Sequence, residues 1–392
     1  MESLYKTHQY LLEHIDSPLR RRLMDTINWN DRLICLKGTR GVGKTRFLLQ
    51  YAKENFLPED KRCLYINLNN FYFTVKSIKD FVNEFRMKGG LVLLIDQIFK
   101  YPNWASELSF CYDNYPDLKI IFTGSSVLDL DDENHCLNGK VVTYDVYGFS
   151  FREFLELQSG CKLDSYPLEE ILEHHVEISN KIVSQLRPLA YLKDYLHHGF
   201  YPFYLEKRNF SENLLKTTNM MLEIDVLSIN QVEQSYLPKL RKLLYLLSVT
   251  TPGSPNISQL SIDIETSRAT VMNYIKYLKD AHLVNLLYPI AEDFPKKPAQ
   301  LYMQNTNLLY ATRMISVDKQ VLQETFFYNQ VHKDYKVNLG SKNAQFLVNG
   351  QYHFSIGDQI KGKFNPDVYY AIDGIESGER KVIPLWLFGF LY

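Results

Sequence analysis

The sequence has 392 residues, enough for two or three domains, and its 45% hydrophobic content allows sizeable cores. A net charge of −1 excludes a uniformly basic nucleic-acid coat but leaves room for a local basic face. The five cysteines are scattered and include no C-x-x-C pair, which excludes a disulfide framework and a cysteine metal site. The N-terminus lacks a signal-peptide core and the longest apolar run, 382–392, is too short to span a bilayer, so we expect a cytoplasmic protein without a membrane partner.

Residues 1–30 carry the apolar spacing of a helical segment, followed by a basic patch at 20–22. From 31 to 150, short apolar runs alternate with amphipathic segments. The expected strands are 33–36, 63–68, 91–95, 119–122 and 141–146, and the helices between them are 44–55, 77–87 and 103–114. This alternation predicts an α/β fold in which helices cover a parallel sheet.

A glycine-rich loop joins the first expected strand to the first helix. Residues 38–45 read Gly-Thr-Arg-Gly-Val-Gly-Lys-Thr, the G-x-x-x-x-G-K-T pattern of a phosphate-binding Walker A segment, or P-loop. Its glycines let backbone N–H groups converge on phosphate oxygens at a helix N-terminus, where the partial charge is positive. Lys44 is expected to reach the β- and γ-phosphates of ATP, and the Thr45 hydroxyl to bind Mg²⁺. The residues expected to contact the nucleotide are Gly38, Arg40, Gly41, Val42, Gly43, Lys44, Thr45 and Arg46.

Two later strands end in polar residues suited to the same chemistry. Asp96 follows the apolar run 91–95 and is expected to hold Mg²⁺ through a water molecule, beside Thr45, at the carboxyl edge where open α/β sheets bind ligands. Hydroxyl side chains follow the strand 119–122, and either Thr123 or Ser125 is expected to lie beside the γ-phosphate and sense it. The alternative for these hydroxyls is a strand-to-helix turn capped by serine.

Residues 151–235 lack strand patterns and are expected to be helical. Residues 236–298 predict a winged helix-turn-helix, because an apolar helix near 240–247 is followed by a break, a short helix from 257 and a second helix over 267–280. Residues 299–392 have a mixed pattern, with a helix near 322–333 and short strands beyond 335.

The order of these motifs resembles that of bacterial and archaeal AAA-type ATPases that carry a C-terminal domain of unknown function with a nuclease-like fold. The matching stretches are 33–45, 91–104, 119–126, 148–154 and 383–390, so the resemblance spans nearly the whole chain. It implies five parts: an N-terminal helical segment (1–30), a P-loop AAA-type ATPase core (31–150), a helical lid (151–235), the winged helix-turn-helix (236–298) and a degenerate nuclease-like domain of the PD-(D/E)XK type (299–392).

Four residues are candidate catalytic residues: Thr123, Ser125, Gln97 and Lys140. At the last two of these positions the chain departs from the family. Gln97 stands where the family has a glutamate that polarises the attacking water. An amide orients water but cannot take its proton, so we expect slow hydrolysis. Lys140 stands where the family has an arginine; if that residue acts on the γ-phosphate, lysine keeps the charge but loses the bidentate fork. Arg152 matches a family motif, yet a structural ion pair with a neighbouring carboxylate is its favoured role.

The C-terminal part is expected to be a nuclease-like scaffold without an active site. A nuclease of this type needs clustered carboxylates for Mg²⁺ and a lysine near the attacking water. Glu324 sits where a helix-borne carboxylate is expected. The strands at 345–348 and 354–357 carry no acidic residue, and Gln359 stands where a lysine is wanted.

Two functions remain open from the sequence. The main hypothesis is an AAA-type ATPase that binds ATP and Mg²⁺ and hydrolyses slowly. The alternative is an ATP-gated switch without significant hydrolysis, which binds DNA or a protein. The helix 268–279 offers arginine, asparagine and lysine side chains of the kind that contact DNA, and an architectural role toward a protein partner or a second copy is equally open.

Overall fold

The computed structural model describes residues 1–16, 18–128, 130, 136–206, 208–228, 232–313, 316–341 and 343–392. These residues form two compact units, 1–147 and 148–392. Each unit has its own five-stranded sheet and its own apolar core.

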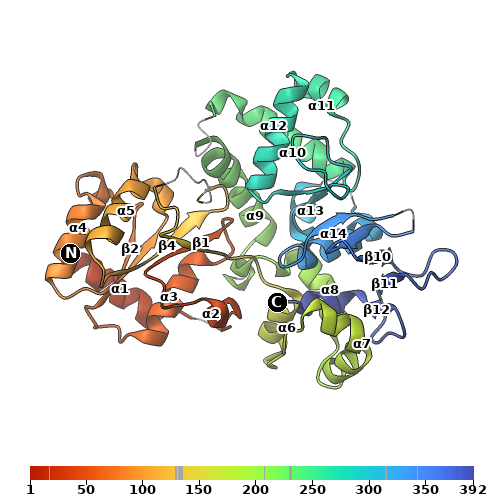
Figure 1. The fold of residues 1–392 in the computed structure, drawn as a ribbon, viewed down its shortest axis with the longest axis horizontal. Helices are drawn as coiled ribbons and strands as arrows, with labels where there is room; N and C mark the ends of the chain where they lie inside the picture. The colour runs from red at the N-terminus through yellow and green to blue at the C-terminus, as the bar shows by residue number, and fades with distance from the viewer. Residues whose placement is uncertain are drawn as a thin grey trace. The chain divides into compact units, whose positions relative to one another are not determined.

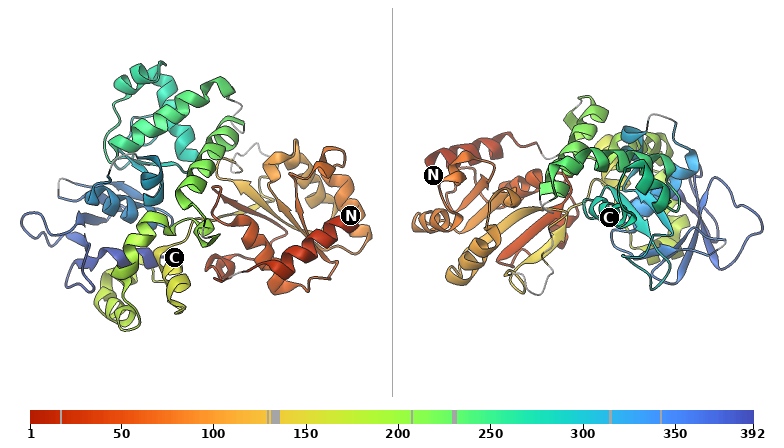
Figure 2. Two further views of the ribbon diagram at one scale, coloured as in Figure 1. Left: turned by 180° about the vertical axis from the view of Figure 1, so that it is seen from behind. Right: turned by 90° about the horizontal axis from the view of Figure 1, so that it is seen from above.

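The first unit is built on a parallel sheet with strand order β2-β3-β4-β1-β5. Its strands are β1 (Leu33–Gly38), β2 (Cys63–Asn67), β3 (Val92–Asp96), β4 (Lys119–Ser125) and β5 (Val142–Asp145). Helices lie on both faces of the sheet (Figures 1 and 2): α1 (Glu2–His14), α2 (Leu23–Thr26), α3 (Lys44–Asn55), α4 (Ile78–Met87) and α5 (Trp104–Asn114), with short 3₁₀ turns η1 (Phe71–Thr74) and η2 (Ile98–Lys100). The predicted α/β fold with a parallel sheet is confirmed.

Strands β1 to β4 read as mainly apolar runs because helices bury them on both faces, whereas β5 at the end of the strand order is not buried. In β1, Ile34 and Leu36 point to one face, where they share a core cluster with Phe47 and Leu48 of α3 and Leu12 of α1. All five of these side chains are at most 2% exposed. This packing holds the carboxyl end of β1 and the first turn of α3 in fixed positions.

Helix α1 contacts β2, which lies at one end of the strand order. The side chain of His8 is fully buried, and its Nδ1 accepts the backbone N–H of Tyr65 in β2 at 3.1 Å. Exposed strand edges invite pairing with other chains, and an imidazole acceptor satisfies this edge N–H. Burial lowers the pKa of His8 to about 4, so the imidazole is neutral near pH 7.

This histidine should make the first unit less stable in acid. In the unfolded chain His8 titrates at its ordinary pKa, above the folded value, so its stabilising contribution is complete above about pH 6.5 and is lost as the pH falls toward about 4. The loss amounts to about 3 kcal/mol. A His8→Asn variant keeps an acceptor for the Tyr65 N–H without a titratable ring. Denaturant unfolding at about pH 7 and about pH 4.5 should show a smaller acid loss for the variant than for the wild type; equal losses would contradict the assignment.

The second unit begins with helices. They are α6 (Phe151–Ser159), α7 (Leu168–Val183), α8 (Pro188–Asp194), a π-helical turn η3 (Tyr195–Gly199), η4 (Pro202–Glu206), α9 (Phe210–Met220) and a second π-helical segment η5 (Met221–Ser228). A capping box starts α6: the Ser150 hydroxyl accepts the Glu153 N–H, and the Glu153 carboxylate accepts the Ser150 N–H. Arg152, 5% exposed, forms the predicted ion pair, with Glu156 at 2.9 Å.

Three helices and a hairpin follow. They are α10 (Leu237–Thr250), α11 (Ile257–Asp263) and α12 (Arg268–Asp280), preceded by the turn η6 (Gln234–Tyr236) and followed by the antiparallel strands β6 (Val284–Leu287) and β7 (Gln300–Met303) (Figure 1). Val271, Ile275 and Leu278 of α12 are buried, whereas Arg268, Asn273, Lys276 and Lys279 are exposed.

The unit ends in a mixed sheet with strand order β12-β11-β10-β9-β8. Its elements are β8 (Val337–Leu339), β9 (Phe346–Val348), β10 (Tyr352–Gly357), β11 (Val368–Ile372) and β12 (Val382–Pro384), with α13 (Thr306–Thr312), α14 (Lys319–Val331) and η7 (Leu385–Phe390). Phe154 of α6 and Leu172 of α7 belong to the same core cluster as Phe326, Phe346 and Trp386. The helices after residue 150 and the C-terminal sheet therefore share one core.

Within the described ranges, no helix is both long and apolar enough to cross a membrane.

Candidate functional site

The glycine-rich loop runs from the end of β1 to the start of α3. Gly41 and Gly43 have φ values of 83° and 93°, a backbone region that favours glycine. A Cβ atom at Gly38 would lie 2.3 Å from the Val146 carbonyl oxygen, so a side chain there would clash with backbone. The loop's path therefore depends on glycine at both positions that the sequence pattern specifies, Gly38 and Gly43, and also at Gly41.

Lys44 opens α3 and lies against the loop that precedes it. Its Nζ donates hydrogen bonds to the carbonyl oxygens of Gly38 at 2.6 Å and Thr39 at 2.7 Å. A bound phosphate would compete with these carbonyls for the ammonium, and charge-assisted hydrogen bonds to phosphate are the stronger kind. Lys44 is thus held beside the loop, at the position from which the sequence expects it to act.

Asp96 ends β3 and is the centre of the site's hydrogen-bond network. Its side chain is 2% exposed. Oδ2 accepts hydrogen bonds from the hydroxyls of Thr45 at 2.7 Å and Tyr65 at 2.9 Å, while Oδ1 accepts the Thr123 hydroxyl at 2.5 Å. The loop, β2, β3 and β4 therefore meet at one carboxylate.

Gln97 follows Asp96 in a left-handed conformation, with φ 59° and ψ 50°. Its backbone N–H donates to Asp96 Oδ1 at 3.1 Å and to the Thr123 hydroxyl oxygen at 2.9 Å. These bonds fix the backbone of Gln97 at the carboxyl edge of the sheet, and its side chain is half-buried. The structure thus brings Gln97 together with Asp96, Thr123 and Thr45.

The two hydroxyl candidates on β4 occupy different places. Thr123 bridges Asp96 and the Gln97 backbone. Ser125 pairs in register with Gly38, where the loop begins, and is 3% exposed. Both lie at the carboxyl edge, and Thr123 is the one joined to the carboxylate.

Lys140 does not join this group. It precedes β5, which runs parallel to β1 with Ile34 opposite Val142, so it lies toward the amino edge while the loop leaves the carboxyl edge. Its Nζ donates to Asp113 Oδ2 at 2.6 Å and to the Ser109 hydroxyl at 2.8 Å on α5. In this structure Lys140 therefore forms an ion pair with α5, and a contact with the γ-phosphate stays a prediction.

Three arginines differ in how they relate to the loop. Arg46 is exposed on the first turn of α3, and the guanidinium of Arg40 lies 5.3 Å from the centre of the Phe99 ring. Arg21, which the sequence showed only as part of a basic patch, donates from Nη1 to the carbonyls of Val42 at 3.3 Å and Tyr147 at 2.9 Å. It pins the loop backbone to the chain that follows β5.

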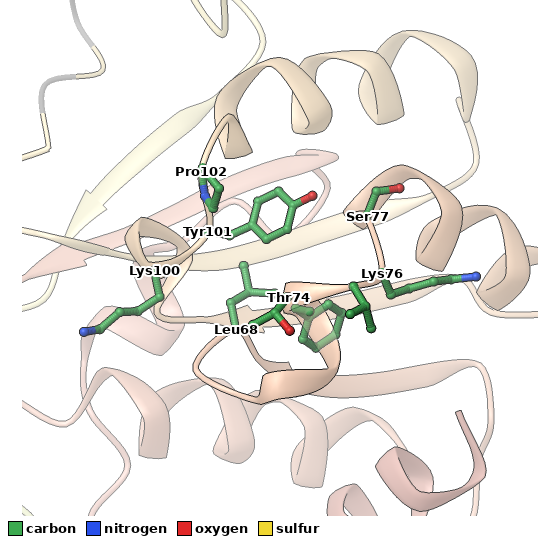
Figure 3. A pocket seen from close by; sticks show the side chains of 9 residues that line it. Leu68, Thr74, Lys76, Ser77, Lys100, Tyr101 and Pro102 are labelled. Atoms are coloured by element: carbon green, nitrogen blue, oxygen red, sulfur yellow. The ribbon is translucent and has the colours of Figure 1, made fainter.

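A groove of about 490 Å³ opens in the first unit, between the β2–α4 connection and the segment after η2 (Figure 3). Leu68 and Tyr101 face it from the two sides, and Lys76 and Lys100 extend outward near its ends. Because η2 directly follows Gln97, one short segment links the carboxylate network to this groove.

The second unit contains an acidic pair that the sequence reasoning missed. Asp358 follows β10 and Asp373 follows β11, and Lys319 Nζ lies 2.8 Å from the first carboxylate and 3.2 Å from the second. The signal was the same as for Asp96, an acid directly after an apolar strand. Glu324 is bonded to the Tyr302 hydroxyl and the Gln320 amide instead, and burial raises its pKa. Across the described residues, no three His, Cys, Asp or Glu side chains are placed to hold a metal.

Two family descriptions match this chain. Residues 30–155 match a family described as an AAA domain, and residues 189–319 match a domain of unknown function, DUF8612. The first match covers the sheet, the loop and the Asp96 network. The second begins in α8 and ends at the start of α14.

Comparisons with known proteins give similar chains without a described activity. An uncharacterized protein of Methanocaldococcus jannaschii, MJ1637, is 28% identical over 293 residues, which are 71% of this chain and 61% of that protein. A second from the same organism, MJ1544, is 25% identical over 276 residues, 66% of this chain and 56% of that protein. This chain thus spans about three-fifths of the length of these relatives.

Among solved structures, a variant of RuvB from Thermotoga maritima aligns with a TM-score of 0.31 and 13% identity, covering 73% of this chain and 89% of that one. The match to the AAA domain family covers the part of the chain that holds the candidate site. It spans the parallel sheet, the glycine-rich loop and Asp96 at the end of β3. Residues 30–155 match the AAA domain family, and over this range the chain has the parallel sheet and glycine-rich loop of a P-loop NTPase core.

Proposed function

We propose that this protein binds ATP with Mg²⁺ and hydrolyses it slowly. The observation that carries the proposal is the junction of Thr45, Asp96, Thr123 and the Gln97 backbone at the carboxyl edge of the sheet, next to the loop. Open α/β sheets bind ligands at this edge.

The donor set fits a magnesium ion. A hydroxyl and a carboxylate are hard oxygen ligands of the kind that Mg²⁺ prefers, and the P-loop threonine is paired with the strand-end aspartate at 2.7 Å. Thr45 and Asp96 would hold the ion. When bound, it would neutralise charge on the phosphate oxygens. Lys44 and the loop N–H groups would orient the phosphates.

Slow hydrolysis follows from the side chain of Gln97. An amide can orient a water molecule, but it has no basic group to accept the proton as that water attacks. General-base catalysis contributes about 10²–10⁴-fold, so a site with this residue should retain binding and lose most of that factor.

Binding of a fluorescent ATP analogue, with Mg²⁺ and with EDTA, tests the proposal directly. We expect saturable binding that Mg²⁺ strengthens, together with phosphate release below about 0.1 per second, under the usual enzymatic range. Absence of binding would refute the proposal, and rapid turnover would refute the role given to Gln97.

A second candidate function is an ATP-gated switch that binds DNA through 268–279. It is favoured by the exposed face of α12, where Arg268, Asn273, Lys276 and Lys279 lie together, although Asp280 pairs with Lys276 at 3.5 Å. We interpret α10–α12 and the β6–β7 hairpin as a winged helix, whose second helix would contact phosphates and base edges.

DNA binding through this face should weaken steeply with salt and depend on ATP. Electrophoretic or anisotropy titrations of a DNA duplex at two salt concentrations, each with and without ATP, measure both dependences, with Lys276→Ala and Lys279→Ala as the test variants. A DNA affinity that is unchanged by both substitutions would favour the alternative, in which the winged helix contacts a protein partner or a second copy of this chain.

A further inference from the structure

We propose that Tyr65 is a positioning residue that sets the Mg²⁺ affinity of the nucleotide site, by occupying a lone pair of Asp96 that the metal would otherwise take. The inference rests on the proposed function, because it concerns the same carboxylate. Tyr65 belongs to β2, and neither the glycine-loop motif nor the strand-end aspartate specifies a residue there.

Hydrogen-bond donors occupy nearly all the lone pairs of the Asp96 carboxylate. A carboxylate has about four lone-pair sites, two on each oxygen. On Oδ1, the Thr123 hydroxyl and the Gln97 N–H account for two, at 2.5 and 3.1 Å. On Oδ2, the hydroxyls of Thr45 and Tyr65 account for the other two, at 2.7 and 2.9 Å, and the Asn67 amide approaches the same oxygen at 3.5 Å.

These donors are not equivalent toward a metal. The Thr45 oxygen can bind a cation while its hydrogen still points to Asp96, so that contact supports the metal. The hydroxyl of Tyr65 is assigned no such supporting role: its hydrogen bond to Oδ2 occupies a lone pair of the carboxylate. Tyr65 is 6% exposed, so its hydroxyl is enclosed beside the carboxylate to which it donates.

The consequence is that Asp96 acts on the metal mainly through Thr45. A cation that coordinates Asp96 directly must displace a hydrogen bond to a charged, buried acceptor, which is stronger than a hydrogen bond between neutral groups. The ring of Tyr65 packs in the core of the first unit, so its position is fixed by apolar contacts that do not depend on the hydroxyl.

The Tyr65→Phe variant removes the hydroxyl and keeps the ring. Fluorescent ATP is held at a fixed concentration, and Mg²⁺ is titrated from an EDTA baseline. We expect the Mg²⁺ midpoint to fall roughly tenfold in the variant, since each 1.4 kcal/mol is a factor of ten. The Mg²⁺-free affinity should stay within about twofold, because the loop and Lys44 are untouched.

Tyr144→Phe is the matched control, because its hydroxyl accepts the Asn28 N–H instead of contacting Asp96; it should leave the midpoint unchanged. A midpoint that is unchanged or higher in Tyr65→Phe would overturn the inference, as would a parallel loss of affinity with and without Mg²⁺, which marks a structural role. A wild-type protein that binds no nucleotide would refute the proposed function itself, so the two failures are distinguishable.

Discussion

Replacing Gln97 with glutamate is expected to raise the rate of ATP hydrolysis by about 10²–10⁴-fold, the range of general-base catalysis. The substitution is nearly isosteric, and the left-handed backbone at this position is held by hydrogen bonds from its own N–H to Asp96 and Thr123. The new carboxylate would therefore stand where the amide stands now and could accept the proton of the attacking water. Single-turnover phosphate release, with nucleotide affinity measured in parallel, checks the prediction.

Gln97→Ala is the companion variant, because it removes the amide without adding a base. It should lower the residual rate if the amide orients water. Should Gln97→Glu leave turnover unchanged while nucleotide affinity stays constant, the catalytic assignment of this position would be wrong.

Lys44→Ala should reduce ATP affinity by about 10–150-fold, because a hydrogen bond to a charged group is worth about 1.5–3 kcal/mol. The ammonium donates hydrogen bonds to the loop carbonyls of Gly38 and Thr39, so the loss should fall mainly on the ligand rather than on the fold. Isothermal titration or fluorescence binding measures the affinity, and thermal unfolding reports on the fold.

Lys53→Ala provides the control on the same helix. Its Nζ donates to the Ile15 carbonyl at 3.0 Å and is far along α3 from the loop. It should leave ATP affinity within about twofold of the wild type. Equal losses in Lys44→Ala and Lys53→Ala would contradict a specific phosphate contact.

The parallel sheet and the main parts of the site were predictable because their signals are local. Continuous apolar runs marked the five strands, glycine spacing marked the loop, and an acid after a strand marked Asp96. Parallel strands bring their carboxyl ends to one edge, so the meeting of Thr45, Asp96 and Thr123 follows from the pattern.

Contacts between distant side chains were not predictable in this way. Tyr65 looks like any aromatic residue of a buried strand, and only the packing of β2 beside β3 turns its hydroxyl toward Asp96. Arg21 lies in a basic patch whose sequence gives no hint that one member contacts the loop.

The position of Lys140 in the structure follows from the direction of strand β5, which could be inferred from the sequence. A residue just before a parallel strand lies at the amino edge, opposite the loop that follows β1. Family correspondence suggested a phosphate contact, whereas strand direction places Lys140 near Asp113. The direction of β5 thus accounts for the place of Lys140 in this structure.

Arg21 also affects local unfolding of the first unit. Its guanidinium joins the chain before β1 to the carbonyl of Tyr147, 126 residues later, and holds the loop carbonyl of Val42 at the same point. Arg21 thus links the chain before β1, the glycine-rich loop and the chain after β5 through hydrogen bonds. Local unfolding that separates these segments must break the Arg21 hydrogen bonds, so a ligand that stabilises the loop should also reduce local opening of the chain at Arg21 and Tyr147.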